Sequence, residues 1–378
     1  MKIVYLITKS EIGGAQVHLL SLIKYAREKS HEVYLITGSD GWMKSEAEKL
    51  GVKTYINQYV ANSFNPIRAL KAILLLRKTI DEIHPDIVHA HSGAAGFLGR
   101  ISLLGKFKTV FTAHGWSFTP GAPILRRMVA VVAEKFASFF TDKIICVSKF
   151  DYSLAKKYAI LKKEDLVQIY NAVEIPPNFI REDKEKIEIL FIGRLAMPKN
   201  LPFFFRAFSD LPKDVQVKAN IKIIGDGPLM EEYKESAKNC SISSSVSFLG
   251  TTTRGELGTY LQFSDIFVLP TLWEGFPMTI LEAMSYGVPV IASSVGGIPE
   301  IVDESVGALV GKNDTKDFTD KLSFLILNKE EREKRGQNAR KLIEEKFTLK
   351  EMLGKTFALY SDLVSENNLN SFQDNSNI

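Results

Sequence analysis

The sequence predicts an α/β protein of two domains, each with a parallel sheet covered by helices on both faces. Short apolar runs at residues 2–8, 32–37 and 143–148 alternate with longer segments of helical periodicity, which is the pattern of βαβ units. The same alternation restarts at residues 187–192, after a stretch of prolines and charges that is typical of a linker. The 378 residues are enough for two ordinary domains with separate cores.

The composition indicates a soluble protein of a reducing compartment, with domains at residues 1–180 and 187–355 and a disordered polar tail at residues 367–378. The two cysteines cannot form a disulfide framework, and no spacing of Cys and His resembles a zinc site. The N-terminus is too short for a signal peptide, and charged residues interrupt the apolar segment 123–140. We therefore expect a cytoplasmic protein without a membrane span.

The charge is unevenly distributed along the chain. Residues 1–181 carry 25 Lys and Arg against 15 Asp and Glu, whereas the remainder carries 23 against 29. A basic first half indicates an anionic partner, either a membrane surface or a phosphorylated molecule. The predicted helices at residues 65–80 and 123–140 are apolar with basic residues beside them, so they could lie on an anionic bilayer or simply pack on the sheet.

The strongest candidate site follows the apolar run at residues 266–269. Glu274 lies in a loop, because Gly275 and Pro277 preclude regular structure, while Glu282 falls in the first turn of a helix expected to begin near Thr279. Unpaired amides at the start of that helix, together with its dipole, would bind an anion such as a phosphate. The two flanking carboxylates would hold sugar-type hydroxyls. Thr279 and Glu282 also match a capping box, which would give Glu282 a purely structural role.

Further loops at strand ends carry residues suited to a phosphorylated ligand. Gly14 belongs to a glycine pair between the first strand and the first helix, where backbone can approach a ligand or form a plain tight turn. Arg194 and Lys199 follow the strand at residues 187–192 and could neutralise a diphosphate. Because the sequence lacks an Asp-x-Asp metal motif, side chains and helix dipoles would have to stabilise the leaving group.

Histidines cluster near two strand ends in the first half. His89 and His91 lie on one face of a strand, but no third ligand is evident, so we expect no metal. His114 follows the next strand at its C-terminal edge, where ligands of open α/β sheets bind. Trp116 follows closely and could either stack on a sugar or pack in the core.

The spacing of Glu274 and Glu282, within Glu-Gly-Phe-Pro and Leu-Glu-Ala-Met, resembles the signature of glycosyltransferase family 4. These are retaining nucleotide-sugar enzymes with two Rossmann-like domains facing across a cleft, the GT-B fold, and further matches extend over nearly the whole chain. The resemblance implies a C-terminal nucleotide-sugar domain, an N-terminal acceptor domain and a helix at residues 356–366 that returns to the first domain. It also implies that neither a protein nucleophile nor a metal or other cofactor is needed.

The resemblance assigns roles residue by residue. Catalytic residues are His114 and Glu274. The donor-binding residues are Gly14, Arg194, Lys199, Gly227, Phe276, Pro277, Met278, Thr279 and Glu282, and the acceptor candidates are His91, Ser92 and Trp116.

The segments around His91 and His114 resemble bacterial enzymes that build O-antigen, capsule or exopolysaccharide. We therefore expect transfer of a hexose or N-acetylhexosamine from a UDP-sugar to a polyprenyl-diphosphate-linked saccharide, at the inner face of the plasma membrane and without nucleic acid. A UDP-sugar 2-epimerase of the same architecture is the alternative, although the close glutamate pair argues against it. A sugar phosphorylase would need a pyridoxal-binding lysine.

Overall fold

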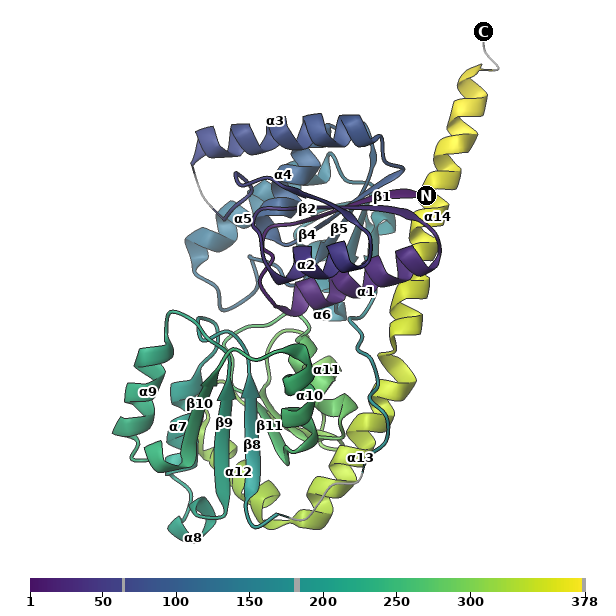
Figure 1. Ribbon diagram of the computed structural model, residues 1–378. Coiled ribbons are helices and arrows are strands. Elements are labelled where there is room, and N and C mark those ends of the chain that lie inside the picture. Colours follow the sequence, from purple (N-terminus) through teal and green to yellow (C-terminus); the bar gives the residue numbers. More distant parts are fainter. Residues whose placement is uncertain (63–64, 180–183, 376–378) are drawn as a thin grey trace. The chain divides into compact units, whose positions relative to one another are not determined.

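The structure is a computed structural model that describes residues 1–62, 65–179 and 184–375. It divides into two compact units, the first formed by Met1–Asn171 with Leu349–Ile378 and the second by Ala172–Thr348. Each unit is built on one sheet in which all strand pairs are parallel (Figure 1). The predicted fold class, two α/β domains with parallel sheets, is confirmed.

Unit 1 has a seven-stranded sheet in the order β3-β2-β1-β4-β5-β6-β7. Its strands are β1 Lys2–Ile7, β2 Glu32–Thr37, β3 Lys53–Ile56, β4 Ile87–His91, β5 Lys108–Ala113, β6 Lys143–Cys146 and β7 Leu166–Gln168. Its helices are α1 Gly14–Glu28, α2 Trp42–Lys49, α3 Pro66–Ile83, α4 Gly93–Leu103, α5 Ile124–Ser138, α6 Lys149–Lys157, the short η1 Lys163–Asp165 and α14 Leu349–Asn375.

Unit 2 has a six-stranded sheet in the order β10-β9-β8-β11-β12-β13. Its strands are β8 Ile187–Ile192, β9 Ala219–Ile224, β10 Val246–Gly250, β11 Ile266–Leu269, β12 Val290–Ser293 and β13 Gly307–Val310. Its helices are α7 Leu201–Ser209, α8 Lys213–Gln216, α9 Met230–Asn239, α10 Arg254–Gln262, α11 Met278–Ser285, α12 Thr315–Leu327, α13 Lys329–Lys346 and the short η2 Ser243–Ser245 and η3 Ile298–Glu300.

The central strands are buried on both faces because helices cover both sides of each sheet. In unit 1, α3 and α4 pack together on one face of the sheet while α1 and α2 lie on the other (Figure 1). Strands β1, β4 and β5 are therefore buried along nearly their whole length, which explains the apolar run of β1 and why the polar side chains of β4 and β5 are buried as well. Among the described residues, no helix combines the length and apolar character needed to cross a membrane.

The boundary between the units falls after Asn171, earlier than the sequence predicted. The reason is that Val173 pairs with Thr348 in a β-bridge and donates a hydrogen bond to the Phe347 carbonyl at 3.3 Å, so this segment belongs to unit 2. The chain then returns to unit 1 at Leu349, ahead of the helix expected at residues 356–366, because α14 begins there.

The last helix contacts α1 in unit 1 and buries Tyr360 completely. It continues to Asn375, so helix covers most of the tail at residues 367–378 that polar composition predicted to be disordered. Once the part of α14 that packs on unit 1 has formed, each further residue that joins the helix adds one backbone hydrogen bond. A helix can therefore extend into a polar segment that composition alone predicts to be disordered. Residues 376–378 lie outside the described residues.

Each sheet reverses its strand order at one point, between β1 and β4 in unit 1 and between β8 and β11 in unit 2. Ligands of open α/β sheets bind outside the carboxyl ends of the strands at such a switch point. The loops after β4, β8 and β11 carry Ser92, Arg194 and Glu274, and Gly14 begins the helix that follows β1. Most of the predicted site residues thus sit at the two positions where this fold class binds ligands.

Candidate active site

In unit 2, two loops at the switch point are joined by backbone pairing. The amide of Asn200 donates to the Pro270 carbonyl at 2.9 Å, and the amide of Leu272 donates to the Pro198 carbonyl at 3.0 Å. These bonds hold the loop after β8 beside the loop after β11. As a result, the Lys199 ammonium forms an ion pair with the Glu274 carboxylate. Two side chains that the sequence assigned to different parts of the donor therefore lie in contact.

The loop around Glu274 packs against the loop after β12, which carries Gly296 and Gly297. The amide of Gly297 donates to the Gly275 carbonyl at 2.9 Å. A Cβ built on Gly296 would lie 1.9 Å from the Glu274 carbonyl oxygen, and Gly296 has φ +59°, so only glycine fits there. Phe276 is buried against Phe347, with ring centroids 5.5 Å apart. The backbone that presents Glu274 is thus fixed by packing.

The helix that follows begins with its amides uncapped by any side chain. Pro277 occupies the N-cap of α11, and no described side chain bonds the first amides, at Met278 and Thr279. This start of a helix is suited to an anion. A second cation lies in the loop that carries Lys199, since the side chain of Arg194 is exposed there. The loops at this switch point thus offer both amides and cations to an anionic ligand.

Glu282 does not cap its own helix. Since α11 begins at Met278, Glu282 lies just beyond the first turn, and its carboxylate pairs with the Arg254 guanidinium. The alternative prediction of a capping box at Thr279 and Glu282 is therefore wrong. The capping box of this region is formed instead at the start of α10, by Thr253 and Glu256.

Sequence reasoning missed Arg254, the first residue of α10. Its side chain is partly exposed while the Glu282 carboxylate is largely buried, so Arg254 supplies the compensating charge that the carboxylate needs. The signal in the sequence is the capping box that starts α10 immediately after β10, which places Arg254 at a strand end.

Gly227 has a packing role in the structure. A Cβ built on it would lie 2.3 Å from the Leu195 carbonyl oxygen, so the loop after β9 approaches the loop after β8 closely. Gly225 in the same loop has φ +136° and a built Cβ 1.9 Å from the Gly193 carbonyl oxygen. These glycines hold two loops together at the sheet edge, and contact of Gly227 with a donor stays a prediction.

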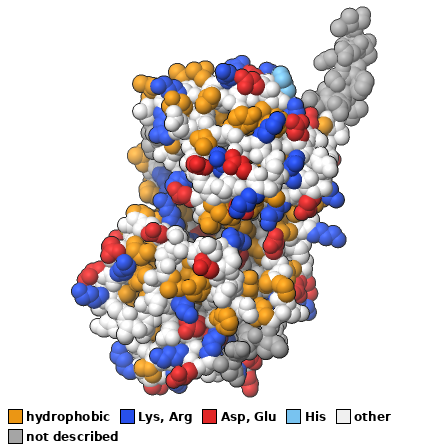
Figure 2. All heavy atoms as spheres, in the orientation of Figure 1, with side chains coloured by type: hydrophobic (Ala, Val, Ile, Leu, Met, Phe, Trp, Pro, Cys, Tyr) orange, Lys and Arg blue, Asp and Glu red, His pale blue; other side chains and the backbone are white. Residues whose placement is uncertain are grey.

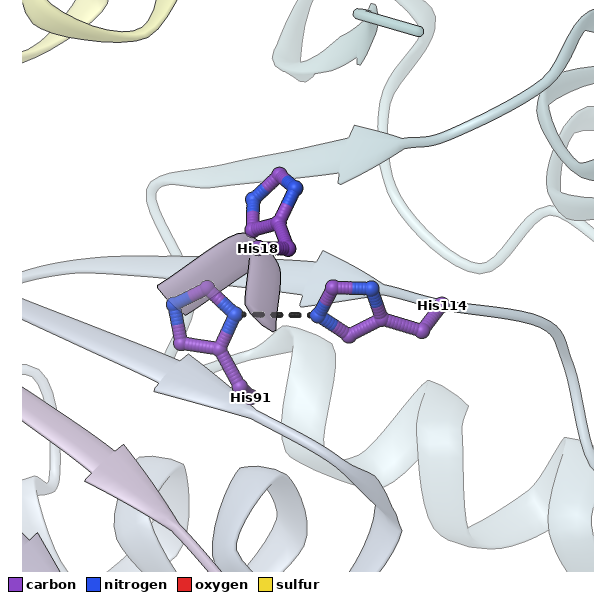
Figure 3. A group of neighbouring side chains, drawn as sticks. All are labelled: His18, His91 and His114. Atoms are coloured by element: carbon purple, nitrogen blue, oxygen red, sulfur yellow. Dashed lines mark hydrogen bonds between the residues drawn. The ribbon is translucent and has the colours of Figure 1, made fainter. Parts of the chain in front are cut away.

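In unit 1, three histidines meet at the switch-point edge of the sheet (Figure 3). His91 ends β4, His114 follows β5, and His18 lies on α1, one turn after Gly14 at the helix start. His91 Nδ1 and His114 Nε2 are 3.1 Å apart, and the His18 ring meets the His114 ring edge-on at 5.0 Å between centroids. The sequence showed no third ligand beside His89 and His91, whereas the structure brings His18 and His114 to His91.

All three imidazoles are neutral at pH 7. Burial, opposed by a hydrogen bond with Asn171, lowers the pKa of His18 to about 4. Burial, with smaller repulsion from neighbouring histidines, holds the pKa values of His91 and His114 well below their usual range. The His114 ring is only half-buried, so it faces solvent more than the other two.

His89 serves the fold. Its Nε2 lies 2.7 Å from the Thr112 hydroxyl, and its Nδ1 is bonded to the Tyr360 hydroxyl of α14. Both ring nitrogens are thus engaged, and His89 is not available as a metal ligand beside His91. It instead fixes the last helix of the chain to the centre of the unit 1 sheet.

The other two acceptor candidates differ in their surroundings. The Ser92 hydroxyl accepts a hydrogen bond from the Thr8 amide at 3.1 Å, which joins the loops after β1 and β4 at the switch point. Trp116 is 4% exposed, stacks on Phe118 and donates its indole N–H to the Asp151 carbonyl at 2.9 Å. The ring and the N–H of Trp116 are both used in the core, which is the packing alternative, and a role for Trp116 at the acceptor stays a prediction.

Comparisons with known proteins agree with this arrangement. Residues 12–175 match "Glycosyltransferase Family 4" and residues 174–342 match "Glycosyl transferases group 1". Two Escherichia coli proteins are similar: the O-antigen biosynthesis glycosyltransferase WbnH, at 30% identity over 81% of this chain and 85% of its own, and a UDP-Gal:alpha-D-GlcNAc-diphosphoundecaprenol alpha-1,3-galactosyltransferase, at 29% over 94% and 98%.

A similar fold is found in the crystal structure of Anabaena HepE in complex with UDP-glucose. The TM-score is 0.82 at 19% identity, over 96% of this chain and all of that one. The two family matches together cover residues 12–342, and the E. coli relatives extend over most of the sequence. The chain belongs to the glycosyltransferases of family 4, with a family 4 first domain and a group 1 second domain.

Proposed function

We propose that this protein is a retaining glycosyltransferase that moves a hexose or N-acetylhexosamine from a UDP-sugar to a lipid-linked saccharide in bacterial surface polysaccharide synthesis. The observation that carries the proposal is the switch point of unit 2, where Lys199, Glu274 and the uncapped start of α11 converge. Relatives supply the chemical class, since one is named for UDP-galactose and an undecaprenol-linked acceptor, and HepE binds UDP-glucose in its crystal structure.

Each group of this site suits one part of a UDP-sugar. Glu282 would accept hydrogen bonds from the ribose hydroxyls, while the amides at the start of α11 and the cations Arg194 and Lys199 would bind the diphosphate. Glu274 would hold the sugar. The ion pairs in the structure are consistent with this assignment. Glu274 pairs with Lys199 and Glu282 with Arg254, and the hydroxyl groups of a bound UDP-sugar would donate to the same carboxylates.

The chemical step depends on stabilising the departing diphosphate. Fixed cations and helix amides that face the leaving group stabilise its growing charge without reorganisation, and this electrostatic effect usually contributes more to catalysis than any other. We propose that no metal takes part and that the leaving phosphate itself accepts the proton of the attacking hydroxyl on the same face of the sugar. His114 of unit 1 is assigned to the transferred sugar, and His91 and Ser92 to the acceptor.

A membrane-bound acceptor fits the surface of unit 1. Helix α5 leaves Leu125 75% exposed and Phe139, at its C-cap, 82% exposed, beside the basic residues Arg126 and Arg127. Helix α3 likewise exposes apolar side chains among lysines and arginines. Figure 2 shows hydrophobic side chains next to Lys and Arg on the visible face of the molecule. Such faces suit the cytoplasmic surface of an anionic bilayer, where the lipid-linked acceptor would be found.

The donor is tested by thermal unfolding with UDP, GDP, ADP and NAD in turn, each with and without EDTA. A ligand at one hundred times its dissociation constant adds about 2.7 kcal/mol, which moves a midpoint by several degrees. We expect UDP alone to stabilise the protein, unaffected by EDTA, and a Glu274→Ala variant to bind UDP but lose transfer. Stabilisation by NAD only, or an active Glu274→Ala variant, would contradict the proposal.

The membrane surface is tested by flotation with anionic liposomes. A variant with Leu125→Ser and Phe139→Ser should bind roughly 100-fold or more weakly, because each side chain gives up about 1.5–3 kcal/mol of burial and each 1.4 kcal/mol is about a factor of ten in affinity. Leu327→Ser, on α12 of unit 2 and 50% exposed, is the matched control and should bind like the parent. Equal loss in both variants, or binding that ignores salt, would refute this surface.

A further inference from the structure

Three side chains at the edge of the unit 1 sheet have the arrangement of a metal site. One ligand nitrogen from each of His18, His91 and His114 lies within 4.8 Å of the others. The closest pair, His91 Nδ1 and His114 Nε2, is 3.1 Å apart (Figure 3). Tetrahedral zinc, with Zn–N bonds of about 2.0–2.1 Å, places its ligand nitrogens about 3.4 Å apart. Small rotations of the rings would therefore bring all three nitrogens to one ion.

The histidines are in the charge state that binds metal, and the proton shared by His91 Nδ1 and His114 Nε2 would move to the far nitrogen of one ring when an ion binds. Each imidazole is neutral, because burial holds its pKa below the ordinary value, and a neutral ring offers one lone pair. His18 Nδ1 and His91 Nε2 are buried without a hydrogen-bond partner among the described residues. A buried polar atom in that state costs free energy, so the site gains when an ion engages His18 Nδ1, whereas His91 would bind through the Nδ1 that faces His114.

The scaffold fixes where the rings lie. His91 is part of β4, which pairs with β5 directly before His114, so these two rings are placed by adjacent strands. His18 is on the buried side of α1, the helix that follows β1 at the same edge. Metal sites built on strands and helices keep their geometry better than sites on loops. His114, half-buried, leaves one side of the group open to solvent.

We propose that His18, His91 and His114 bind one Zn²⁺, or a similar divalent ion such as Co²⁺ or Ni²⁺, and that this ion inhibits the enzyme. Three imidazole ligands leave a fourth coordination position for water or an anion, and imidazole suits these metals. The inhibition rests on the proposed function, since it requires His114 to act on the sugar, whereas the metal site itself does not. An ion that engages the His114 lone pair would withdraw the ring from that role.

The metal site is tested by titrating the full chain, free of any polyhistidine tag, with Co²⁺ and recording the visible absorption of four-coordinate cobalt. We expect one Co²⁺ per chain, displaced by Zn²⁺. Removing a residue that only hydrogen-bonds to a metal ligand can weaken metal binding by roughly 100-fold. His18→Gln removes a ligand itself, so it should weaken Co²⁺ binding by more than that. His84→Asn is the matched control and should bind normally, because His84 is an exposed histidine at the end of α3.

The variants are checked for folding by circular dichroism, and His91→Gln provides a second test if His18→Gln fails to fold. A parent protein that takes up no stoichiometric cobalt or zinc would overturn the proposal, whatever the variants do. Equal affinity in His18→Gln and the parent would also overturn it.

Inhibition is measured separately in the transfer assay. We expect Zn²⁺ to inhibit with a midpoint at its own dissociation constant, which is obtained from its displacement of Co²⁺. EDTA should restore full activity. If metal binds at the three histidines but transfer continues, the inhibitory role and the assignment of His114 to the sugar both fail while the metal site stands. If transfer occurs and no metal binds, the proposed function stands alone.

Discussion

The ion pair between Lys199 and Glu274 couples the stability of unit 2 to its ligand site. Their side chains are 14% and 18% exposed, so each charge depends largely on the other for compensation. Breaking one partner of a fully buried pair costs about 3–5 kcal/mol, and partial exposure lowers this, so we predict that Lys199→Met costs about 2–3 kcal/mol of unfolding free energy. UDP affinity should fall as well, because a cation facing the diphosphate is lost.

A double variant separates the interaction energy of the Lys199–Glu274 pair from the cost of losing either charge alone. With both charges removed, as in Lys199→Met combined with Glu274→Gln, no uncompensated charge remains, so the cost should be well below the sum of the two single variants. The free energies come from urea unfolding of each protein. Because the chain has two units, two unfolding transitions are expected, and the one that UDP moves to higher urea is assigned to unit 2.

The control is an exposed ion pair in the same unit. Lys234 pairs with Glu231 on α9 at 2.8 Å, with side chains 47% and 84% exposed, so Lys234→Met should change stability by less than about 1 kcal/mol. Strictly additive costs for Lys199→Met and Glu274→Gln would refute the coupling. So would a Lys199→Met variant that is no less stable than Lys234→Met.

Two further predictions concern the supports of the two units. Tyr360→Phe removes the hydroxyl that bonds buried His89, so we expect a loss of about 1–3 kcal/mol in the thermal unfolding of unit 1, and an unchanged midpoint would contradict this role. Gly296→Ala should abolish transfer and lower the midpoint of unit 2, because its Cβ would lie 1.9 Å from the Glu274 carbonyl, whereas Gly255→Ala meets nothing within 4 Å and should retain activity. Similar behaviour of the two alanine variants would show that Gly296 does not support the loop.

Much of unit 2 could be predicted from the sequence because its signals are local. Gly275 and Pro277 place Glu274 in a loop, and the buried run before it marks the strand that ends at the switch point. The partner of Glu282 could not be predicted in this way. Arg254 comes from a different helix, and the pairing exists only because α10 and α11 both begin at the carboxyl-end edge of the same parallel sheet. Ion pairs between distant segments depend on tertiary structure, which no local pattern contains.

The core position of Trp116 could not be predicted for a similar reason. An indole ring is apolar on its faces and polar at its N–H, so its sequence context favours a sugar platform and a core position equally. The position of the ring is decided by whether another segment of the chain accepts a hydrogen bond from the indole N–H. Here the Asp151 carbonyl of α6 does so, while Phe118 covers the ring. The distance along the chain between Trp116 and Asp151 hides that contact from sequence reasoning.

His18 shows what topology could add to a prediction from sequence. His91 and His114 were candidates because they end strands, whereas a histidine inside a helix was passed over. Yet a helix that follows the first switch-point strand begins at the same sheet edge as the ends of the neighbouring strands. A polar residue one turn into such a helix, on its buried side, must therefore face the residues that end those strands. His18 meets that condition, since Gly14 begins α1 and Leu19 and Leu22 mark its buried side. The order of strands and helices, once predicted, is thus enough to bring the three histidines together.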